Sequence, residues 1–164
     1  MSLAMRRRLS HIDPKGRVRM VDVGAKAVTA RVAVARGRVF MHRETLALLR
    51  DGDAAKGDVL TTAHVAAVMA AKRTSEIIPL AHGLNLDGVD LAFTLDDDSA
   101  SVGIEARARA RGRTGVEMEA LTAVAVAALT LYDMLKAVDR GMVIGEVAVW
   151  EKRGGRSGVF RRRA

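Results

Sequence analysis

Apolar and polar residues alternate in four segments of the chain, and this period of two predicts β-strands. The segments cover residues 26–41, 84–95, 101–109 and 143–151. The alternation changes phase at Gly88, which predicts a β-bulge in the second segment. A run of polar residues separates the second segment from the third, so we expect these two strands to form an antiparallel hairpin.

The first strand segment has two different faces. One face carries Val28, Ala30, Val32 and Val34, and the other carries Thr29, Arg31 and Ala33. Gly37 predicts a turn before the segment ends, because glycine often interrupts a strand.

Two helices are predicted between the first and second strand segments. Residues 43–50 form a short helix that Gly52 closes. Asp58 is expected to cap a second helix, which continues to about Ile78 and stops at Pro79.

A third helix is predicted before the last strand. Thr114 and Glu117 have the spacing of a capping box, in which each side chain bonds the backbone of the other residue. The helix is expected to reach about Asp139, with Gly141 just past its end.

The resulting order is strand, helix in two pieces, strand, strand, helix, strand. This order is typical of the α+β class with a ferredoxin-like split βαβ fold, in which helices cover one face of an antiparallel sheet. We expect residues 1–24 to form an irregular basic arm, residues 25–153 a single domain and residues 154–164 a flexible tail rich in Gly and Arg. Residues 154–158, Gly-Gly-Arg-Ser-Gly, could hold a phosphate, but a disordered end is the favoured interpretation.

Length and composition fit one globular domain. The chain has 164 residues, of which 49% are hydrophobic and 28% charged. Its net charge is +8, but six positive charges stand near the two ends and leave +2 for the rest: Arg6, Arg7, Arg8, Arg161, Arg162 and Arg163. A basic RNA- or nucleotide-binding module is therefore kept as an alternative. The aromatic content of 3% argues against the stacking surfaces that single-strand binders use, so we expect no nucleic-acid partner.

The absence of cysteine excludes disulfides, thiolate metal ligands and a cysteine nucleophile. The arginine-rich start differs from a signal peptide, and the longest apolar stretch, residues 120–132, is shorter than the roughly 20 residues that cross a bilayer. We therefore expect a cytoplasmic protein that binds no membrane. The four histidines show no paired ligand spacing and predict no metal site: His11, His42, His64 and His82.

Asp133 and Lys136 are three positions apart and therefore share one face of the third predicted helix. Such a pair is most often a solvated ion pair. Asp133 nevertheless closes an apolar run, and a lysine that loses its water beside a carboxylate forms an acid–base couple. The pattern leaves both interpretations open.

Cations stand at both ends of the second predicted helix. Lys56 and Gly57 precede the capping Asp58, where free backbone N–H groups favour an anion. A plain helix-start turn is the simpler interpretation. Lys72 and Arg73 lie near the other end, where the helix dipole favours positive charge in any case.

Glu119 is not explained by the predicted capping box, unlike Glu117. It lies 14 residues before Asp133, which corresponds to about 21 Å along a helix. One small-substrate pocket on one chain cannot contain both carboxylates. A site that uses both is therefore long or is shared between two subunits.

Six segments of the chain together resemble the signature blocks of the cyclic pyranopterin monophosphate synthase family. They stand in the family's order within residues 9–159 and are Met20–Val23, Lys56–Val59, Ala70–Thr74, Ile78–His82, Thr114–Ala123 and Leu129–Val138. The blocks Thr-Gly-Val-Glu-Met-Glu-Ala-Leu-Thr and Tyr-Asp-Met are together highly specific.

The resemblance implies a ferredoxin-like fold and a homo-hexamer, a trimer of dimers with sites at a subunit interface. It implies a lyase that takes 3′,8-cyclo-7,8-dihydro-GTP, which a radical-SAM GTP cyclase supplies. The product is cyclic pyranopterin monophosphate, formed with release of diphosphate in molybdenum cofactor biosynthesis. The chemistry requires no resident cofactor, although Mg²⁺ can accompany the substrate's triphosphate.

The family motifs also imply roles for individual residues. Asp133 matches the active-site aspartate, Lys136 its neighbouring catalytic lysine and Lys56 a second essential lysine. The substrate-binding positions are Leu80, Ala81, His82, Glu117, Met118, Glu119, Asp22, Lys72 and Arg73. The cations and His82 would hold the triphosphate, and Asp133 with Lys136 would transfer protons.

Three residues depart from the family pattern. Ala81 and Gly83 stand where the family usually has Cys and Pro, and Leu135 stands where it has Cys before the lysine. Either the chemistry needs neither thiol, or the chain is a catalytically impaired paralogue of the same fold. We favour a working enzyme because every charged position named above is present.

Overall fold

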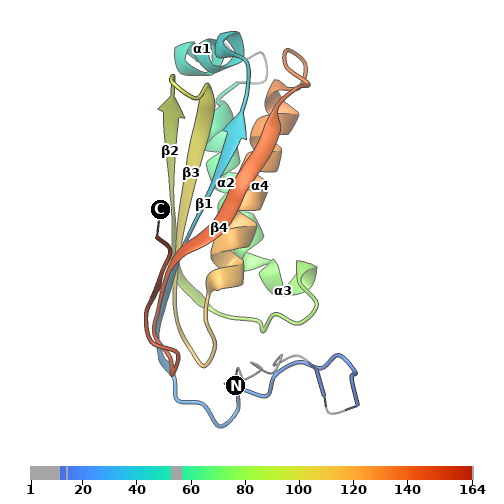
Figure 1. Cartoon of the computed structure of the whole chain (residues 1–164), viewed down its shortest axis with the longest axis vertical. Helices are drawn as coiled ribbons and strands as arrows, with labels where there is room; N and C mark the ends of the chain where they lie inside the picture. Colours follow the sequence, from blue (N-terminus) through green and yellow to red (C-terminus); the bar gives the residue numbers. More distant parts are fainter. Residues whose placement is uncertain (1–11, 14, 53–56, 164) are drawn as a thin grey trace, which may run out of the picture.

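The computed structural model describes residues 12–13, 15–52 and 57–163, and these form one five-stranded antiparallel sheet. The strands lie in the order β2-β3-β1-β4-β5 (Figure 1). Their bounds are Thr29–Phe40 for β1, Leu86–Asp96 for β2, Ser101–Gly112 for β3, Val143–Arg153 for β4 and Phe160–Arg161 for β5. The alternation of apolar residues predicts the first four strands and does not predict β5.

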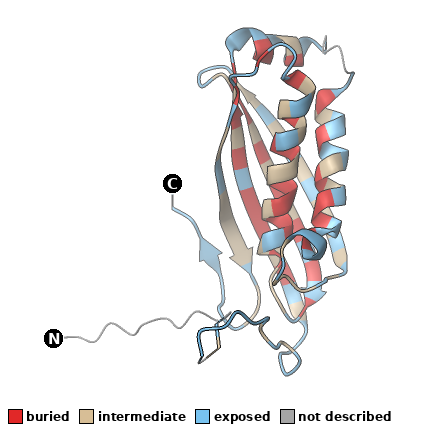
Figure 2. Cartoon of the chain, turned by 90° about the vertical axis from the view of Figure 1, so that its right-hand side faces the viewer, coloured by how far each residue is buried: buried red, intermediate tan, exposed pale blue. Residues whose placement is uncertain are grey.

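The described residues form four helices, α1 Arg43–Asp51, α2 Val59–Lys72, α3 Thr74–Ile77 and α4 Glu117–Leu135. α2 and α4 pack side by side on one face of the sheet (Figure 2). α1 lies beside the end at which the β2–β3 hairpin turns, and α3 lies at the opposite end (Figure 1). This arrangement confirms the predicted ferredoxin-like α+β fold.

α4 packs closely on the sheet because both surfaces consist of small side chains. Ala33 and Ala35 of β1 are fully buried, and each pairs with a buried alanine of β3. The buried side of α4 also consists largely of alanine: Ala120, Ala123, Ala127 and Ala128. Small residues on both sides let the helix axis approach the sheet, so apolar surface is buried without large side chains.

Gly37 lies within this close contact and not in a turn. β1 is continuous from Thr29 to Phe40, so the predicted turn at Gly37 is wrong. A Cβ atom at Gly37 would lie 2.7 Å from Val124 Cγ1 and 3.1 Å from Val147 Cγ2. The glycine is therefore needed for the approach of α4.

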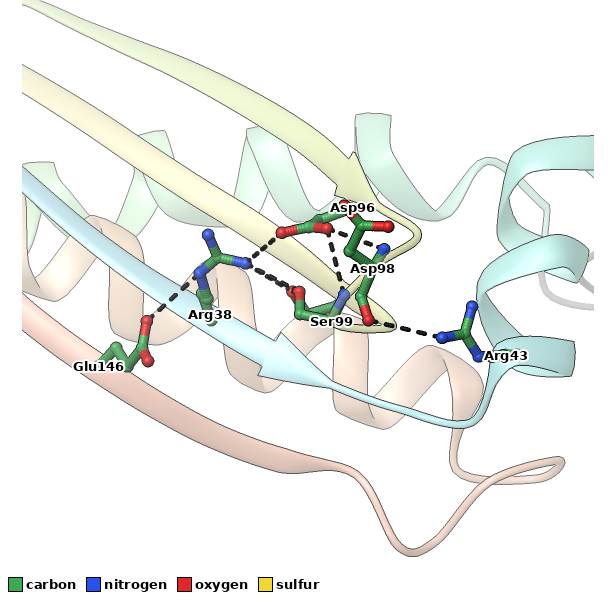
Figure 3. Close-up of polar contacts among 7 residues, drawn as sticks. Arg38, Arg43, Asp96, Asp98, Ser99 and Glu146 are labelled. Carbon is green, nitrogen blue, oxygen red and sulfur yellow. Dashed lines mark hydrogen bonds and ion pairs between the residues drawn. The ribbon is translucent and has the colours of Figure 1, made fainter.

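The β2–β3 hairpin confirms the predicted bulge, because its register shifts between Leu86 and Gly88. At its turn, Arg38 of β1 donates hydrogen bonds to Asp96 Oδ2 at 2.8 Å and to Ser99 Oγ at 3.0 Å (Figure 3). The Arg38 guanidinium and Ser99 together lower the pKa of Asp96 from 3.8 to about 2. The turn is thus fastened to the neighbouring strand by a charged carboxylate.

The second predicted helix is capped as expected but is interrupted near its end. The Asp58 carboxylate accepts a hydrogen bond from Thr61 N at 2.9 Å, which confirms the N-cap. α2 ends at Lys72, and Arg73 leaves the helical region with φ −108° and ψ 13°. The buried Thr74 hydroxyl donates to the Ala71 carbonyl at 3.0 Å, and α3 begins there.

The predicted capping box at the start of α4 is wrong. Val116 is the N-cap residue, and no side chain caps the helix there. The Glu117 side chain instead folds back over Gly115, where a Cβ atom would collide with its carboxylate. Gly115 therefore makes room for an acidic side chain at the start of the helix.

The predicted end of α4 is also wrong, since the helix stops at Leu135, well before Asp139. Lys136 is the C-cap residue, and its backbone N–H still bonds the Tyr132 carbonyl at 2.9 Å. The chain then turns, with Asp139 N donating to the Leu135 carbonyl at 3.1 Å. Lys136 thus lies at a turn and not inside the helix.

α4 is the one helix of the described residues that is long and apolar enough to cross a membrane, with 19 residues and a mean hydropathy of 1.5. It is longer than the apolar stretch of residues 120–132, because it begins at Glu117 and ends at Leu135. In the structure, 56% of its most apolar window is buried inside the protein. It is therefore accounted for as the central helix of the core.

We expect Gly37→Ala to lower the free energy of unfolding by about 1–3 kcal/mol, the usual range for an added methyl group in a tightly packed core. The new Cβ would push against Val124 of α4 and Val147 of β4. Urea denaturation measures the change. The double variant Gly37→Ala, Val124→Ala removes the first obstacle and should be less destabilised than the two single losses added together. Additive losses would contradict the contact.

Candidate functional site

A cleft opens where the N-terminal arm, the loop after α3 and the start of α4 meet. Its volume is about 370 Å³. Residues that the family motifs assign to substrate binding line it together: Leu80, Ala81, His82, Glu117, Met118 and Glu119. Val21 and Val23 of the arm complete the wall with Lys26, Thr114 and Gly115. The fold thus brings together two sequence blocks that are more than thirty positions apart.

His82 is fixed in this cleft by the N-terminal arm. Its Nε2 atom lies 2.8 Å from the Val21 carbonyl oxygen. A carbonyl only accepts, so Nε2 carries the proton of this hydrogen bond. The contact holds the loop of His82 and the arm against each other, which shapes the cleft.

Glu119 is a buried acid in the first turn of α4. It is only 4% exposed, and its Oε2 atom has no hydrogen-bond partner among the described residues. Burial raises the pKa of this carboxyl above its ordinary value, and the charge of Glu117 raises it further. A carboxyl group with a raised pKa keeps its proton to a higher pH than an exposed one, and while protonated it can donate as well as accept a hydrogen bond.

A second, larger cavity of about 1000 Å³ continues from the first and shares Lys26, Thr114, Gly115 and Glu117 with it. Its basic residues are Lys26, Arg31, Arg113, Lys152 and Arg156. Asp22, a predicted binding residue, also lines it, and its carboxylate accepts from Gly24 N at 2.8 Å. This concentration of positive charge suits a polyanion.

Arg31 is the most buried of these cations, at 9% exposure. Its Nε donates to the Gly112 carbonyl at 3.2 Å, and its guanidinium lies against Gly155 so closely that a Cβ there would collide with it. Gly155 has φ +75°, which glycine adopts without strain. The Thr29 hydroxyl in the same cavity is also buried without a partner among the described residues. The buried guanidinium of Arg31 and the unpartnered hydroxyl of Thr29 both favour a ligand that accepts hydrogen bonds.

Sequence reasoning missed the basic residues of this second cavity as site residues. In the structure Arg31 lies on the same face of β1 as the buried Ala33 and Ala35. The sequence places it on the more polar of the two faces, so the alternation gives no signal that it has a function. The run at 154–158 is the available signal, because the turn it forms places Gly155, Arg156 and Ser157 in the cavity wall. The interpretation of that run as phosphate-holding agrees better with this geometry.

Asp133 and Lys136 lie at the other end of α4. Lys136 Nζ donates to Asp133 Oδ1 at 2.6 Å, and the two side chains are 50% and 59% exposed. In a single chain they form a solvated ion pair and not a desolvated acid–base couple. Because α4 is uninterrupted, the predicted separation of about 21 Å from Glu119 is retained.

Two further predicted cations, Lys72 and Arg73, are not part of the two cavities. Lys72 and Arg73 are exposed at the junction of α2 and α3, and neither lines the cavities described above. Lys56 lies outside the described residues.

The structure shows what surrounds the three residues that depart from the family pattern. Leu135 is 1% exposed in the core, so a side chain there faces the interior of the protein. Ala81 lines the cleft. Among the described residues, a Cβ at Gly83 would meet only Ser75 Oγ, at 3.7 Å, which is ordinary van der Waals contact. Among the described residues, no group of three or more His, Asp or Glu side chains could hold a metal ion.

The sequence was compared with known families and proteins. Residues 20–155 match the MoaC family. The chain is 60% identical over 152 residues to cyclic pyranopterin monophosphate synthase of Heliobacterium modesticaldum. The aligned region covers 93% of this chain and 96% of that protein. It is 61% identical over 154 residues to the synthase of Chloroflexus aurantiacus, covering 94% of each chain. The synthase of Thermomicrobium roseum is 60% identical, with coverage of 94% and 93%.

We expect Glu119→Gln to stabilise the protein at neutral pH. The raised pKa of Glu119 means that the folded protein resists ionisation of this group, so stability is lost as the pH rises from the ordinary carboxyl range through the pKa of the folded state. Glutamine cannot ionise. The difference in Tm between variant and wild type should therefore be near zero at about pH 4 and grow above it. The exposed Glu76→Gln is the control. A difference that does not change with pH would contradict the burial argument.

Proposed function

This chain belongs to the MoaC family, and we propose that it converts 3′,8-cyclo-7,8-dihydro-GTP to cyclic pyranopterin monophosphate with release of diphosphate. It is then a lyase of molybdenum cofactor biosynthesis with a nucleotide-derived substrate. One observation carries the proposal beyond the family match: a cleft with a buried acid is joined to a cavity lined by basic residues. Neither the family match nor the relatives support the alternative RNA-binding module.

The basic cavity supports binding of the substrate's triphosphate. Arg31, Lys152 and Arg156 reach it from β1, from β4 and from the turn after β4. Cations beside a triphosphate stabilise the negative charge that develops on diphosphate as it leaves. Mg²⁺ that arrives with the triphosphate would find the carboxylates of Asp22 and Glu117 on the same wall.

The smaller cleft supports binding of the purine-derived ring system. Glu119 in its protonated form can donate a hydrogen bond to a ring nitrogen or oxygen, and ionised it can accept one. His82 lies on the same wall and is held by the Val21 carbonyl. Because the two cavities share Lys26 and Glu117, a substrate can occupy both at once.

The proton transfers are assigned to Asp133 and Lys136, and this assignment requires a second copy of the chain. The pair lies about 21 Å from Glu119 along α4. In the proposed homo-hexamer, a trimer of dimers, the Lys136 end of one chain would meet the Glu119 end of another. The same contact would remove water from the ion pair and create the acid–base couple. Lys56, the other lysine assigned by motif, would act in the same site.

The remaining parts of the proposal concern the setting of the enzyme. A radical-SAM enzyme would supply the cyclised nucleotide, and both reactions would take place in the cytoplasm. The replacement of two cysteines by Ala81 and Leu135 is compatible with activity, because the proposed chemistry uses carboxylates, amines and a histidine.

The function is tested by supplying the cyclised nucleotide and measuring diphosphate release. Wild type should release one diphosphate for each product molecule, whereas Lys136→Ala and Asp133→Asn should lose most of the rate, since one proton-transfer group contributes about 10²–10⁴-fold. Lys56→Ala should lose a similar share. The exposed Lys15→Ala, which lines neither cavity, is the matched lysine control and should retain most of the activity. An inactive wild type would refute the proposed function.

A site shared by two chains predicts complementation between inactive variants. His82→Ala impairs one half of the site and Lys136→Ala the other. In a two-fold dimer, random mixing of the two variants restores one intact site in each mixed dimer, or about a quarter of the wild-type activity. The measurement is diphosphate release after the variants are unfolded and refolded together. If the refolded mixture is only as active as the average of the two separate variants, each chain carries its own site.

A further inference from the structure

Asp139 lies in the loop between α4 and β4, and its side chain is only 1% exposed. Its carboxylate accepts hydrogen bonds from Gly141 N at 2.9 Å, from His42 N at 2.9 Å and from Thr45 Oγ1 at 3.2 Å. Burial on its own would raise the pKa of Asp139, but the bonds from His42 and Gly141 outweigh it and lower the pKa. The residue is therefore a fixed anion at neutral pH.

This carboxylate replaces a missing helix cap. α1 begins after His42, whose own side chain makes no capping hydrogen bond. The Asp139 carboxylate comes from a distant part of the sequence and lies at the N-terminus of α1. There it accepts hydrogen bonds from His42 N and from the Thr45 hydroxyl. The N-terminus of a helix favours negative charge, so the contact stabilises α1 and holds the loop against it.

The same loop carries Lys136. Lys136 is the C-cap residue of α4, and Asp139 N donates to the Leu135 carbonyl at 3.1 Å. The turn that presents Lys136 is therefore held on one side by the end of α4 and on the other by the Asp139 carboxylate. Without that carboxylate, the turn loses its attachment to His42 and to Thr45 of α1.

We propose that Asp139 is a positioning residue for Lys136, which it fixes relative to α1 through its contacts with His42 and Thr45. The inference rests on the proposed function, in which Lys136 transfers protons to a substrate held largely by another chain. Asp139 itself touches no substrate. Its effect should appear in the rate of the chemical step and not in substrate binding, because a displacement of about 1 Å at a reacting group can cost about 100-fold in rate.

The test compares Asp139→Ala with Ser101→Ala. Ser101 is a fully buried side chain at the same end of the sheet and accepts a hydrogen bond from Arg38 at 2.9 Å. Both variants should lower the Tm. Measured well below either Tm, kcat of Asp139→Ala should fall about 10- to 100-fold with KM nearly unchanged, while kcat of Ser101→Ala should stay close to wild type. Asp139→Asn, which keeps one acceptor oxygen, should fall between Asp139→Ala and wild type.

A second measurement does not depend on turnover. Acetic anhydride labels exposed lysines, and mass spectrometry gives the rate at Lys136 relative to Lys72 of the same chain. This relative rate should change in Asp139→Ala and in Asp139→Asn, and it should stay the same in Ser101→Ala. If Asp139→Ala does not fold, Asp139→Asn carries both measurements.

The outcomes separate the two claims. Wild-type kcat in a folded Asp139 variant, or an unchanged labelling rate at Lys136, would overturn the positioning role. An equal loss of kcat in Ser101→Ala at an equal loss of Tm would overturn it too, because general destabilisation would then explain the effect. An inactive wild type whose Lys136 labelling still responds to Asp139→Asn would refute the proposed function and leave the link from Asp139 to Lys136 standing.

Discussion

The close contact between α4 and the sheet is the constraint on which the rest of the structure depends. Alanines on both surfaces and Gly37 in the middle of β1 allow it, and larger side chains there would push the helix away. The contact fixes the whole length of α4. Its first turn places Glu119 in the cleft, and its last turn leads to Lys136. One packed helix thus determines both the shape of the binding region and its distance from the ion pair.

Most of the fold could be predicted from the sequence, because its signals are local. The alternation of apolar residues gave the four long strands, the phase change at Gly88 gave the bulge, and Asp58 gave the start of α2. One error, the capping box of α4, has a local cause, because the Glu117 side chain lies over Gly115. The other errors involve partners distant in sequence. Gly37 resembles a turn residue until Val124 is seen opposite it, and α4 stops early because the chain after it bonds to α1.

The candidate site was predictable in part for the same reason. The blocks around His82 and Glu119 carry specific motifs, and the structure joins them in one cleft. The basic cavity was not predicted, because Arg31, Arg113 and Lys152 belong to three separate segments whose side chains meet only after the sheet has formed. Net charge was a poor guide, since it counts the charges of a chain and says nothing of where they gather. The solvated state of Asp133 and Lys136 could not be read from the apolar run before them, because the run packs on the sheet on the other side of the helix.

Gly155 and Arg31 have a consequence for how this protein can change in evolution. The guanidinium of Arg31 occupies the space in which any side chain at position 155 would begin, and the backbone at Gly155 has φ +75°. A side chain at position 155 would be held in a backbone conformation that L residues rarely adopt. It would also displace the Arg31 guanidinium and so move a buried cation of the cavity. Position 155 is therefore expected to remain glycine, both for its backbone angle and for the space that it leaves to a cation of the cavity.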